Sequence, residues 1–317
     1  MSFDSAENSL SPRPSTDSAA VYASQAGTQV SFRDYLELTK PRLSLLSIIT
    51  AIVGYLAADG QRAFTVLTAL IIGTSLAAGG AAVLNQWWEH KTDAKMARTK
   101  SRPIPSGLIE PRRALLFGLG ISLAGCAILG LGANLLSCAL AAFTIFSYIL
   151  VYTPLKKVTV RNTIVGAIPG AVPPLIGWAA ATGQIGVLGW VLFGILFTWQ
   201  MPHFYAIAWT YRNDYAQAGY RMLPKVDPSG MRTALESFLF AVLLVGVSLL
   251  PAFLGYTSAV YGAVAIGCGA YLAQRSIAFL RATNDRKDVT ARKLFFASIL
   301  YLPVVLAGLV LDILLLA

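Results

Sequence analysis

The sequence predicts an all-α membrane protein with about nine transmembrane helices. Of its 317 residues, 56% are hydrophobic and 13% are charged, whereas a soluble domain carries roughly 25% charged residues. Apolar runs of about 20 residues recur along the chain, and a helix of that length spans the hydrocarbon core of a bilayer. Cys126, Cys138 and Cys268 all lie within such runs. Their spacing supports neither a disulfide framework nor a zinc site.

The expected helices are joined by short links and by a few longer basic loops. A link as short as residues 183–186 makes its two neighbours an antiparallel hairpin. Prolines interrupt one apolar run at Pro169, Pro173 and Pro174, and broken membrane helices commonly line cavities, although an irregularity of packing is an alternative. We place the spans at about residues 43–58, 64–86, 114–131, 134–153, 163–182, 187–207, 235–255, 258–280 and 294–316.

The chain begins with a polar, serine-rich segment. Its first 30 residues contain no apolar stretch of the kind found in a signal peptide. Such a composition cannot bury enough apolar surface to order the chain. We therefore predict a disordered cytoplasmic tail over residues 1–38 and one membrane domain over residues 39–317.

The net charge of +10 is distributed by loop. The loops between spans 2 and 3, 4 and 5, 6 and 7, and 8 and 9 hold 7, 3, 4 and 6 Lys and Arg residues with their flanks, and the first 42 residues hold four more. The opposite loops hold only Arg62. Basic loops stay cytoplasmic, which predicts an inside N-terminus and an outside C-terminus. Membrane topology thus explains most of the excess of basic residues, and binding of nucleic acid is not needed to explain it. Some of these residues remain available to bind phosphates or anionic lipid.

A line of oxygen-bearing side chains ends the second span. Asn85, Glu89 and Asp93 are four residues apart and therefore lie on nearly one face of a helix. Mg²⁺ prefers carboxylate and amide oxygens, and it often combines one or two carboxylates with the phosphates of a substrate. A site for a metal and a diphosphate is one interpretation. The other is a solvated helix end, where the acids balance Lys91 and Lys95.

Two further polar clusters are predicted on the same side of the membrane. They are YTPLKKVTVRN after the fourth span and YRNDYAQAGYRMLPK, which contains Asp214, after the sixth. Acids that bind divalent cations, beside cations and a phenol that bind phosphate oxygens, suit a diphosphate leaving group. For each basic residue taken alone, membrane topology is the alternative explanation, and for most of them it is the favoured one. The candidates for phosphate contact are Arg98, Lys100, Arg102, Tyr152, Lys156, Lys157, Arg161, Asn162 and Arg212.

Four segments resemble the motif set of the protoheme IX farnesyltransferases, or heme O synthases, a branch of the UbiA superfamily of intramembrane prenyltransferases. The resemblance extends from about Pro41 to the last span. The spacing of Asn85, Glu89 and Asp93 alone marks only the superfamily, whereas RTKSRPIP and WQMPHF resemble the heme-modifying branch more specifically. The segments are NQWWEHKTDAKMARTKSRPIPSG, YTPLKKVTVRNTIVGAIPGAVPPLIGW, WQMPHFYAIAW and DYAQAGYRMLP.

The resemblance implies nine helices around a central cavity that cytoplasmic loops cap. It implies transfer of the farnesyl group of farnesyl diphosphate to a vinyl group of heme B, with addition of water, in a bacterial inner membrane. Asn85, Glu89, Asp93 and Asp214 would then hold Mg²⁺. Two departures weaken this transfer of roles, because Glu89 replaces the more usual Asp and position 218 is Ala, without a second carboxylate. Residues that match the phosphate-side loop of the family are Tyr152, Lys156, Lys157, Arg161 and Asn162.

The WQMPHF segment supplies a candidate heme contact. His203 follows Pro202, with Trp199 one helical turn earlier. An imidazole nitrogen can ligate the heme iron or orient a propionate by a hydrogen bond. Equally, a histidine near a helix end can cap a backbone carbonyl.

Two other functions fit parts of the pattern. A UbiA-type enzyme acting on a quinone precursor or a chlorophyllide shares the acid line but not WQMPHF or RTKSRPIP. A transporter also places polar residues on membrane helices, yet transporters tend to pair broken helices in two halves, and here one span is interrupted. Docking of a downstream heme-modifying enzyme or a terminal oxidase is left open.

Overall fold

The computed structural model describes residues 30–60 and 63–316, and over these residues every regular element is a helix. The first 29 residues, which hold most of the predicted tail, lie outside this range. The helices are α2 (Phe32–Leu38), α3 (Pro41–Ala57), α4 (Phe64–Asp93), α5 (Pro111–Gly132), α6 (Leu135–Phe146), the π-helical η1 (Ser147–Tyr152), α7 (Thr153–Val158), α8 (Asn162–Ala171), α9 (Pro173–Thr182), α10 (Val187–Thr210), α11 (Arg212–Gln217), α12 (Leu223–Val226), α13 (Met231–Phe253), α14 (Ala259–Arg281) and α15 (Asn284–Leu316).

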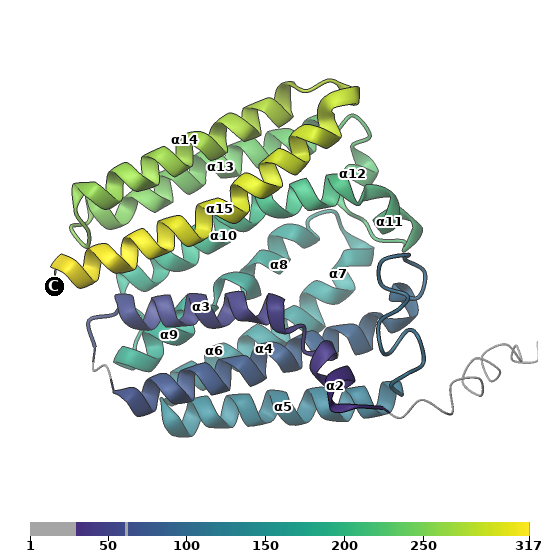
Figure 1. Cartoon of the computed structure of the whole chain (residues 1–317), viewed down its shortest axis with the longest axis horizontal. Helices are drawn as coiled ribbons and strands as arrows, with labels where there is room; N and C mark the ends of the chain where they lie inside the picture. Colours follow the sequence, from purple (N-terminus) through teal and green to yellow (C-terminus); the bar gives the residue numbers. More distant parts are fainter. Residues whose placement is uncertain (1–29, 61–62, 317) are drawn as a thin grey trace, which may run out of the picture.

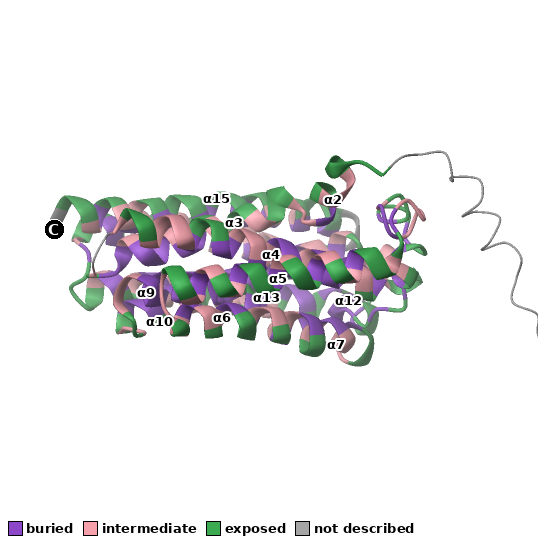
Figure 2. Cartoon of the chain, turned by 90° about the horizontal axis from the view of Figure 1, so that it is seen from below, coloured by how far each residue is buried: buried purple, intermediate pink, exposed green. Residues whose placement is uncertain are grey.

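Length and composition confirm an integral, multi-pass membrane protein. Within the described residues, eight helical segments are long and apolar enough to cross a bilayer, and the pair α2 and α3, bent by 57°, makes a ninth if it is counted as one span. Large apolar side chains such as Leu131 and Phe253 point outward, with exposures of 91% and 85%. Figure 2 shows exposed residues along the outer faces of the helices and buried ones within. Lipid is the solvent that these outer faces require.

Two groups of helices make up the molecule (Figure 1). Helices α10, α13, α14 and α15 pack around one apolar core. Helices α3, α4, α5, α6 and α9 pack around a second core. The short helices α2, α7, α11 and α12 lie at one end of the bundle, and the C-terminus lies at the other (Figure 1). The polar loops identified in the sequence therefore all lie at one end of the bundle (Figure 1).

Helices α3 and α9 cross so closely that two glycines are required at the contact. A Cβ on Gly54 would overlap the backbone of Pro174, and a Cβ on Gly177 would overlap the backbone of Ala51. Small residues at such crossings let membrane helices approach to backbone contact. The α3–α9 pair fixes the position of α3, whose first turns reach the functional site.

The predicted break in the fifth span is present. Helix α8 ends at Ala171 and α9 begins at Pro173, where consecutive prolines lack the backbone N–H that a continuous helix needs. From α10, Gln200 donates its Nε2 to the carbonyl of Ala167 at 3.0 Å. The break lines the central cavity, as expected, through Gly170 and Pro173 among others.

The predicted tail extended too far along the chain. Residues 32–38 form α2 instead of the end of a disordered segment, because Asp34 accepts hydrogen bonds from the backbone N–H and hydroxyl of Ser31 at 2.7 and 3.0 Å. Leu38 is fully buried, and its carbonyl accepts a hydrogen bond from Gln86 at 2.6 Å. A capping box and one anchored apolar residue therefore order a short helix that composition alone assigns to the tail.

We expect Gly177→Val to destabilise the protein by at least about 1–3 kcal/mol, because overpacking a close contact forces backbone shifts. Thermal unfolding in detergent measures the effect. The matched control is Gly267→Val on α14, where an added Cβ meets nothing within 4 Å. Equal melting temperatures for the two variants would contradict the close α3–α9 contact.

Asp227 supports the start of α13 and generates a pH-dependent prediction. Burial alone would raise its pKa, but hydrogen bonds from the backbone and hydroxyl of Thr233, both at 2.8 Å, and from Ser229 lower the pKa of Asp227 below its usual value. A lowered pKa contributes stability above the unfolded-state pKa and loses it as the pH falls through the folded-state value.

Asp227→Asn should therefore lower the free energy of unfolding at pH 7 by about 1 kcal/mol, as the loss of a helix cap does. The difference from wild type should shrink as the pH falls below the usual pKa of an aspartate, about 3.9, and through the lower pKa of folded Asp227. Melting temperatures across that range measure this. The exposed Asp59, changed to Asn, is the control, and a difference that does not vary with pH would contradict the assignment.

Candidate active site

Two adjoining cavities lie between the helix groups. The larger, of about 570 Å³, is mainly apolar and is lined by α3, α4, α6, η1, α8, α9 and α10. The smaller, of about 150 Å³, is polar and lies under the loops at the end of the bundle. Several residues line both cavities, so the two are continuous. These shared residues are Lys40, Arg98, Tyr148, Tyr152, Tyr215 and Met222.

The line of Asn85, Glu89 and Asp93 forms one wall of the polar cavity. All three side chains come from the last turns of α4, and their exposures are 3%, 7% and 1%. The amide of Asn85 donates to Glu89 Oε2 at 3.0 Å and to the hydroxyl of Thr153 at 3.1 Å. The structure thus brings the predicted line together, and its burial excludes the interpretation as a solvated helix end.

Glu89 is the centre of a buried network. Lys156 Nζ, from α7, lies 3.0 Å from both carboxylate oxygens of Glu89, and the hydroxyl of Tyr220 donates to Oε1 at 2.7 Å. Burial and the neighbouring Glu89 carboxylate raise the pKa of Tyr220, so the phenol keeps its proton and remains a donor. The backbone N–H of Arg221 donates to the carbonyl of Lys156 at 2.7 Å and joins the two segments.

Asp93 is bound by the loop that follows α4. Arg102 Nη1 lies 2.6 Å from Asp93 Oδ2, and the hydroxyl of Thr99 donates to the Asp93 carbonyl at 2.7 Å. The Arg102 side chain keeps 28% of its surface exposed, whereas that of Asp93 keeps 2%. The RTKSRPIP segment therefore folds back over the acid line and places an arginine at the cavity.

Positive charge exceeds negative charge in the polar cavity. Besides Glu89 and Asp93, its lining includes Arg98, Arg102, Lys156 and Lys40. Burial and the neighbouring cations lower the pKa of Lys40 to about 7, so positive charge exceeds negative charge by one to two. The Arg98 guanidinium also stacks over the rings of Tyr211 and Tyr215, at 5.0 and 4.9 Å. A polyanion with an attached apolar chain is the ligand that such a cavity and its apolar neighbour fit.

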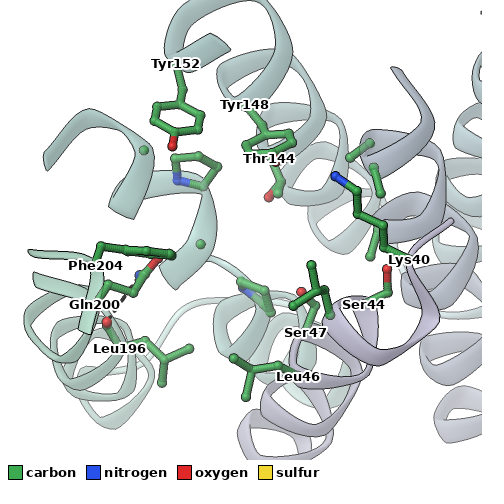
Figure 3. Close-up of a pocket in the computed structure, with 18 of the residues that line it drawn as sticks. Lys40, Ser44, Leu46, Ser47, Thr144, Tyr148, Tyr152, Leu196, Gln200 and Phe204 are labelled. Atoms are coloured by element: carbon green, nitrogen blue, oxygen red, sulfur yellow. Dashed lines mark hydrogen bonds between the residues drawn. The ribbon is translucent and has the colours of Figure 1, made fainter. Parts of the chain in front are cut away.

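Sequence reasoning missed Lys40 as a site residue, because it was counted only toward membrane topology. Lys40 joins α2 to α3 with φ 47° and ψ 62°, and it is the one non-glycine residue with positive φ among those described. Its amino group reaches toward Thr144 and Tyr148 across the cavity (Figure 3). The left-handed backbone of Lys40, which in a non-glycine residue often marks a functional site, is visible only in the structure, so the sequence offers no comparable signal.

Several predicted phosphate ligands have other partners outside both cavities. Arg161 pairs with Glu236 at 3.5 Å, and Arg212 pairs with Asp288 at 2.9 Å. The buried amide of Asn162 donates to the carbonyls of Thr159 and Arg221, at 2.6 and 2.9 Å. Asn162 therefore has a structural role in joining two loops, and diphosphate contacts of these three residues stay predictions.

The remaining predicted residues divide by location. Tyr152 and Lys156 line the polar cavity, whereas Lys100 and Lys157 are exposed at the end of the bundle and line neither cavity. Asp214, on α11, also lies outside both linings. Asp214 sits near Arg98 and helps to raise the pKa of that arginine, which burial alone would lower. A metal-binding role for Asp214 stays a prediction.

The apolar cavity contains the predicted heme contacts. Trp199 and His203 both line it from α10. His203 Nδ1 lies 2.9 Å from the hydroxyl of Ser298 on α15, and the imidazole stacks on Trp199 at 4.9 Å. The partner of the imidazole is therefore a side-chain hydroxyl and not the backbone carbonyl that a capping role would require. Figure 3 shows Gln200 and Phe204 of the same helix facing Ser47 and Leu46 across the cavity.

The donor set suits a hard cation only together with a ligand. Over the described part of the chain, no three His, Cys, Asp or Glu side chains are close enough to hold a metal ion by themselves. Asn85, Glu89 and Asp93 offer one amide and two carboxylates, which matches Mg²⁺ sites that are completed by substrate phosphates. The ion pairs with Lys156 and Arg102 occupy the same carboxylates, so metal binding would compete with them.

Comparisons with known proteins agree with this geometry. The chain is 50% identical over 282 residues to the protoheme IX farnesyltransferase of Opitutus terrae, covering 89% of this chain and 95% of that protein. It is 46% identical over 291 residues to the protoheme IX farnesyltransferase of Solibacter usitatus, covering 88% and 98%. Both alignments include nearly the whole membrane domain.

Solved structures share the fold at low sequence identity. A digeranylgeranylglyceryl phosphate synthase superposes with a TM-score of 0.75 at 19% identity, covering 89% of this chain and 98% of that one. A UbiA homolog from Archaeoglobus fulgidus, bound to GPP and Mg²⁺, superposes with a TM-score of 0.64 at 15% identity, covering 87% and 99%. The model of the UbiA prenyltransferase family matches residues 47–300, and the chain belongs to that family.

Proposed function

We propose that this protein transfers the farnesyl group of farnesyl diphosphate to a vinyl group of heme B, with addition of water, to give heme O and diphosphate. The observation that carries the proposal is the junction of a cationic, acid-lined cavity with a larger apolar one. The names of the relatives support heme as the acceptor. Membership of a prenyltransferase family removes the transporter alternative, and another aromatic acceptor remains the competing hypothesis.

Mg²⁺ is the cofactor that the donor set fits. Asn85, Glu89 and Asp93 would hold it together with diphosphate oxygens, and Asp214 would join if α11 approaches the cavity. When bound, the metal supplies positive charge that neutralises the departing diphosphate. A UbiA homolog solved with GPP and Mg²⁺ supports this assignment.

The cations of the polar cavity bind and stabilise the leaving group. As the bond between the allylic carbon and the diphosphate oxygen breaks, negative charge grows on that oxygen. Lys156, Arg102 and Lys40 line the cavity where this charge would develop. Fixed positive groups in a site that excludes water stabilise such a transition state strongly, because they need no reorganisation.

The residues of the apolar cavity surround the allylic carbon, which becomes cation-like as the diphosphate leaves. Tyr148 and Tyr152 are stacked 5.6 Å apart and line both cavities, so these aromatic rings lie at the junction that the allylic carbon would occupy. Aromatic faces attract cations. The vinyl π electrons form the new carbon–carbon bond, and the carbon next to the porphyrin ring becomes cationic. Water adds there and loses a proton, which leaves a hydroxyethylfarnesyl group.

The distribution of basic loops supports a membrane orientation. We assign the N-terminus and the site loops to the cytoplasm of a bacterium, with the protein in its inner membrane. The C-terminus lies at the end of the bundle away from these loops (Figure 1). A downstream heme-modifying enzyme or terminal oxidase as a partner stays a prediction.

A product assay tests the proposed function. Purified protein in detergent receives heme B, farnesyl diphosphate and Mg²⁺, with EDTA in a parallel sample, and mass spectrometry detects heme with a hydroxyethylfarnesyl group. Product that forms only with metal supports the proposal. A folded preparation that binds farnesyl diphosphate but prenylates a quinone precursor and not heme would move the acceptor to another aromatic.

In the same assay, Asp93→Asn should lower kcat by about 10²- to 10³-fold, the usual cost of losing one electrostatic contact to a transition state. Glu110→Gln is the control, because Glu110 is exposed outside both cavities and, among the described residues, forms an ion pair only with Arg113. Near wild-type turnover of Asp93→Asn at saturating farnesyl diphosphate would disprove the role of the acid line.

Lys40 and Lys100 allow a paired test of where the diphosphate binds. Lys40→Gln should raise the KM for farnesyl diphosphate by at least about 10-fold, since a hydrogen bond to a charged group contributes about 1.5–3 kcal/mol. Lys100→Gln should leave the KM within about twofold, because Lys100 lies outside both cavities. The reverse order of effects would place the diphosphate outside the polar cavity.

A further inference from the structure

One residue of α15 holds both aromatic side chains of the predicted heme contact. Ser298 is fully buried. Its carbonyl accepts a hydrogen bond from Trp199 Nε1 at 2.6 Å, and its hydroxyl oxygen lies 2.9 Å from His203 Nδ1. Sequence distances of 99 and 95 residues separate these partners. Ser298 of α15 thereby holds Trp199 and His203, two residues of the apolar cavity wall, in place.

The hydrogen-bond directions around Ser298 determine the protonation of the imidazole. The Ser298 hydroxyl has one hydrogen, and it donates that hydrogen to the carbonyl of Phe295 at 2.6 Å. A carbonyl can only accept, so the Ser298 oxygen is left as an acceptor toward His203. The imidazole must therefore carry a hydrogen on Nδ1.

The surroundings of His203 favour a neutral ring. Trp199 stacks on it at 4.9 Å, Phe295 lies tilted at 5.0 Å and Phe204 presents an edge at 5.3 Å. No carboxylate forms an ion pair with His203 within the described residues. A charge enclosed by apolar groups without compensation is costly. With Nδ1 protonated and the ring neutral, Nε2 carries a free lone pair.

We propose that Ser298 is a positioning residue that holds His203 in the Nδ1–H tautomer and so presents the Nε2 lone pair to the iron of a porphyrin substrate. The proposal rests on the proposed function, since His203 lines the cavity assigned to heme. A propionate carboxylate only accepts hydrogen bonds, so it cannot bind the Nε2 lone pair. The Nδ1–H tautomer therefore favours ligation of the iron by His203 over a hydrogen bond to a propionate. Metal-ligating histidines usually donate their other ring N–H to an oxygen in this way.

This contact would anchor the porphyrin beside the reacting groups. His203 lies on the wall of the apolar cavity, and Tyr148 and Tyr152 line both this cavity and the polar one. An axial bond from His203 fixes the iron, while Trp199 and Phe295 restrict rotation of the imidazole. A porphyrin held at its iron keeps its vinyl edge in one place relative to the diphosphate cavity.

The tautomer can be measured directly in the wild-type protein. The chain contains two histidines, so ¹⁵N-labelled histidine gives few signals, and His90→Gln removes the second one. We expect the ¹⁵N shifts of His203, without heme, to show protonated Nδ1 and unprotonated Nε2. A protonated Nε2 would overturn the inference without requiring any variant of Ser298 to fold.

Heme titration of the full chain in detergent, without farnesyl diphosphate, measures the effect of the tautomer. Ser298→Ala should weaken binding of ferric heme about 10- to 100-fold, the usual effect of removing a partner of a metal-ligating histidine, and should alter the Soret band. Ser298→Thr keeps the hydroxyl and should retain the wild-type spectrum. The control is Ser276→Ala on α14, a fully buried serine whose hydroxyl donates to the carbonyl of Leu272.

The outcomes separate this inference from the proposed function. Wild-type affinity and spectrum in Ser298→Ala, with both lost in His203→Ala, would show that His203 binds iron without help from Ser298. Unchanged spectra in both variants would remove His203 as a ligand. In either case, formation of farnesylated heme by the wild-type protein would leave the proposed function intact. Absence of that product, despite the expected spectral changes, would count against the function and not against the ligation.

Discussion

The buried contact between Glu89 and Lys156 is the interaction on which the site depends. It joins the end of α4 to α7, and Tyr220 and Asn85 bind the same carboxylate from two further directions. Removing one partner of a buried pair leaves an uncompensated charge, which is strongly destabilising. In the unliganded protein, this carboxylate therefore holds the segments that follow α6 and α10 against α4.

The same bonds define what a ligand must offer. In the proposed complex, a diphosphate would replace the carboxylates as a partner of Lys156 and Arg102, and a divalent cation would replace these cations as a partner of Glu89 and Asp93. Each ligand would supply a partner for the groups that the other leaves unpaired, whereas either ligand alone would leave buried charges without a partner. Co-binding of metal and diphosphate is therefore the mode of binding that we propose for this site.

Periodicity and charge predict the spans and the acid line because both depend on neighbours close in sequence. Residues four apart on one helix must share a face, so Asn85, Glu89 and Asp93 could be found without a structure. The partners of single cations could not. Arg212 pairs with an acid 76 residues away, and Tyr220 reaches Glu89 across 131 residues. Such contacts arise only when the helices pack, and the boundary of α2 likewise depends on burial of one leucine.

The π-helical segment η1 explains how one helix serves both cavities. Tyr148, Tyr152 and Lys156 are four residues apart, and in a regular α-helix each step would rotate by about 40°. The wider π turn of residues 147–152 opposes that drift. Thr153 stabilises it by donating to the carbonyl of Tyr148 at 2.8 Å, and Asn85 donates in turn to Thr153. Two phenols therefore point at the apolar cavity while the lysine stays in line with Glu89. The acid line and the aromatic boundary are held in register by the same hydroxyl.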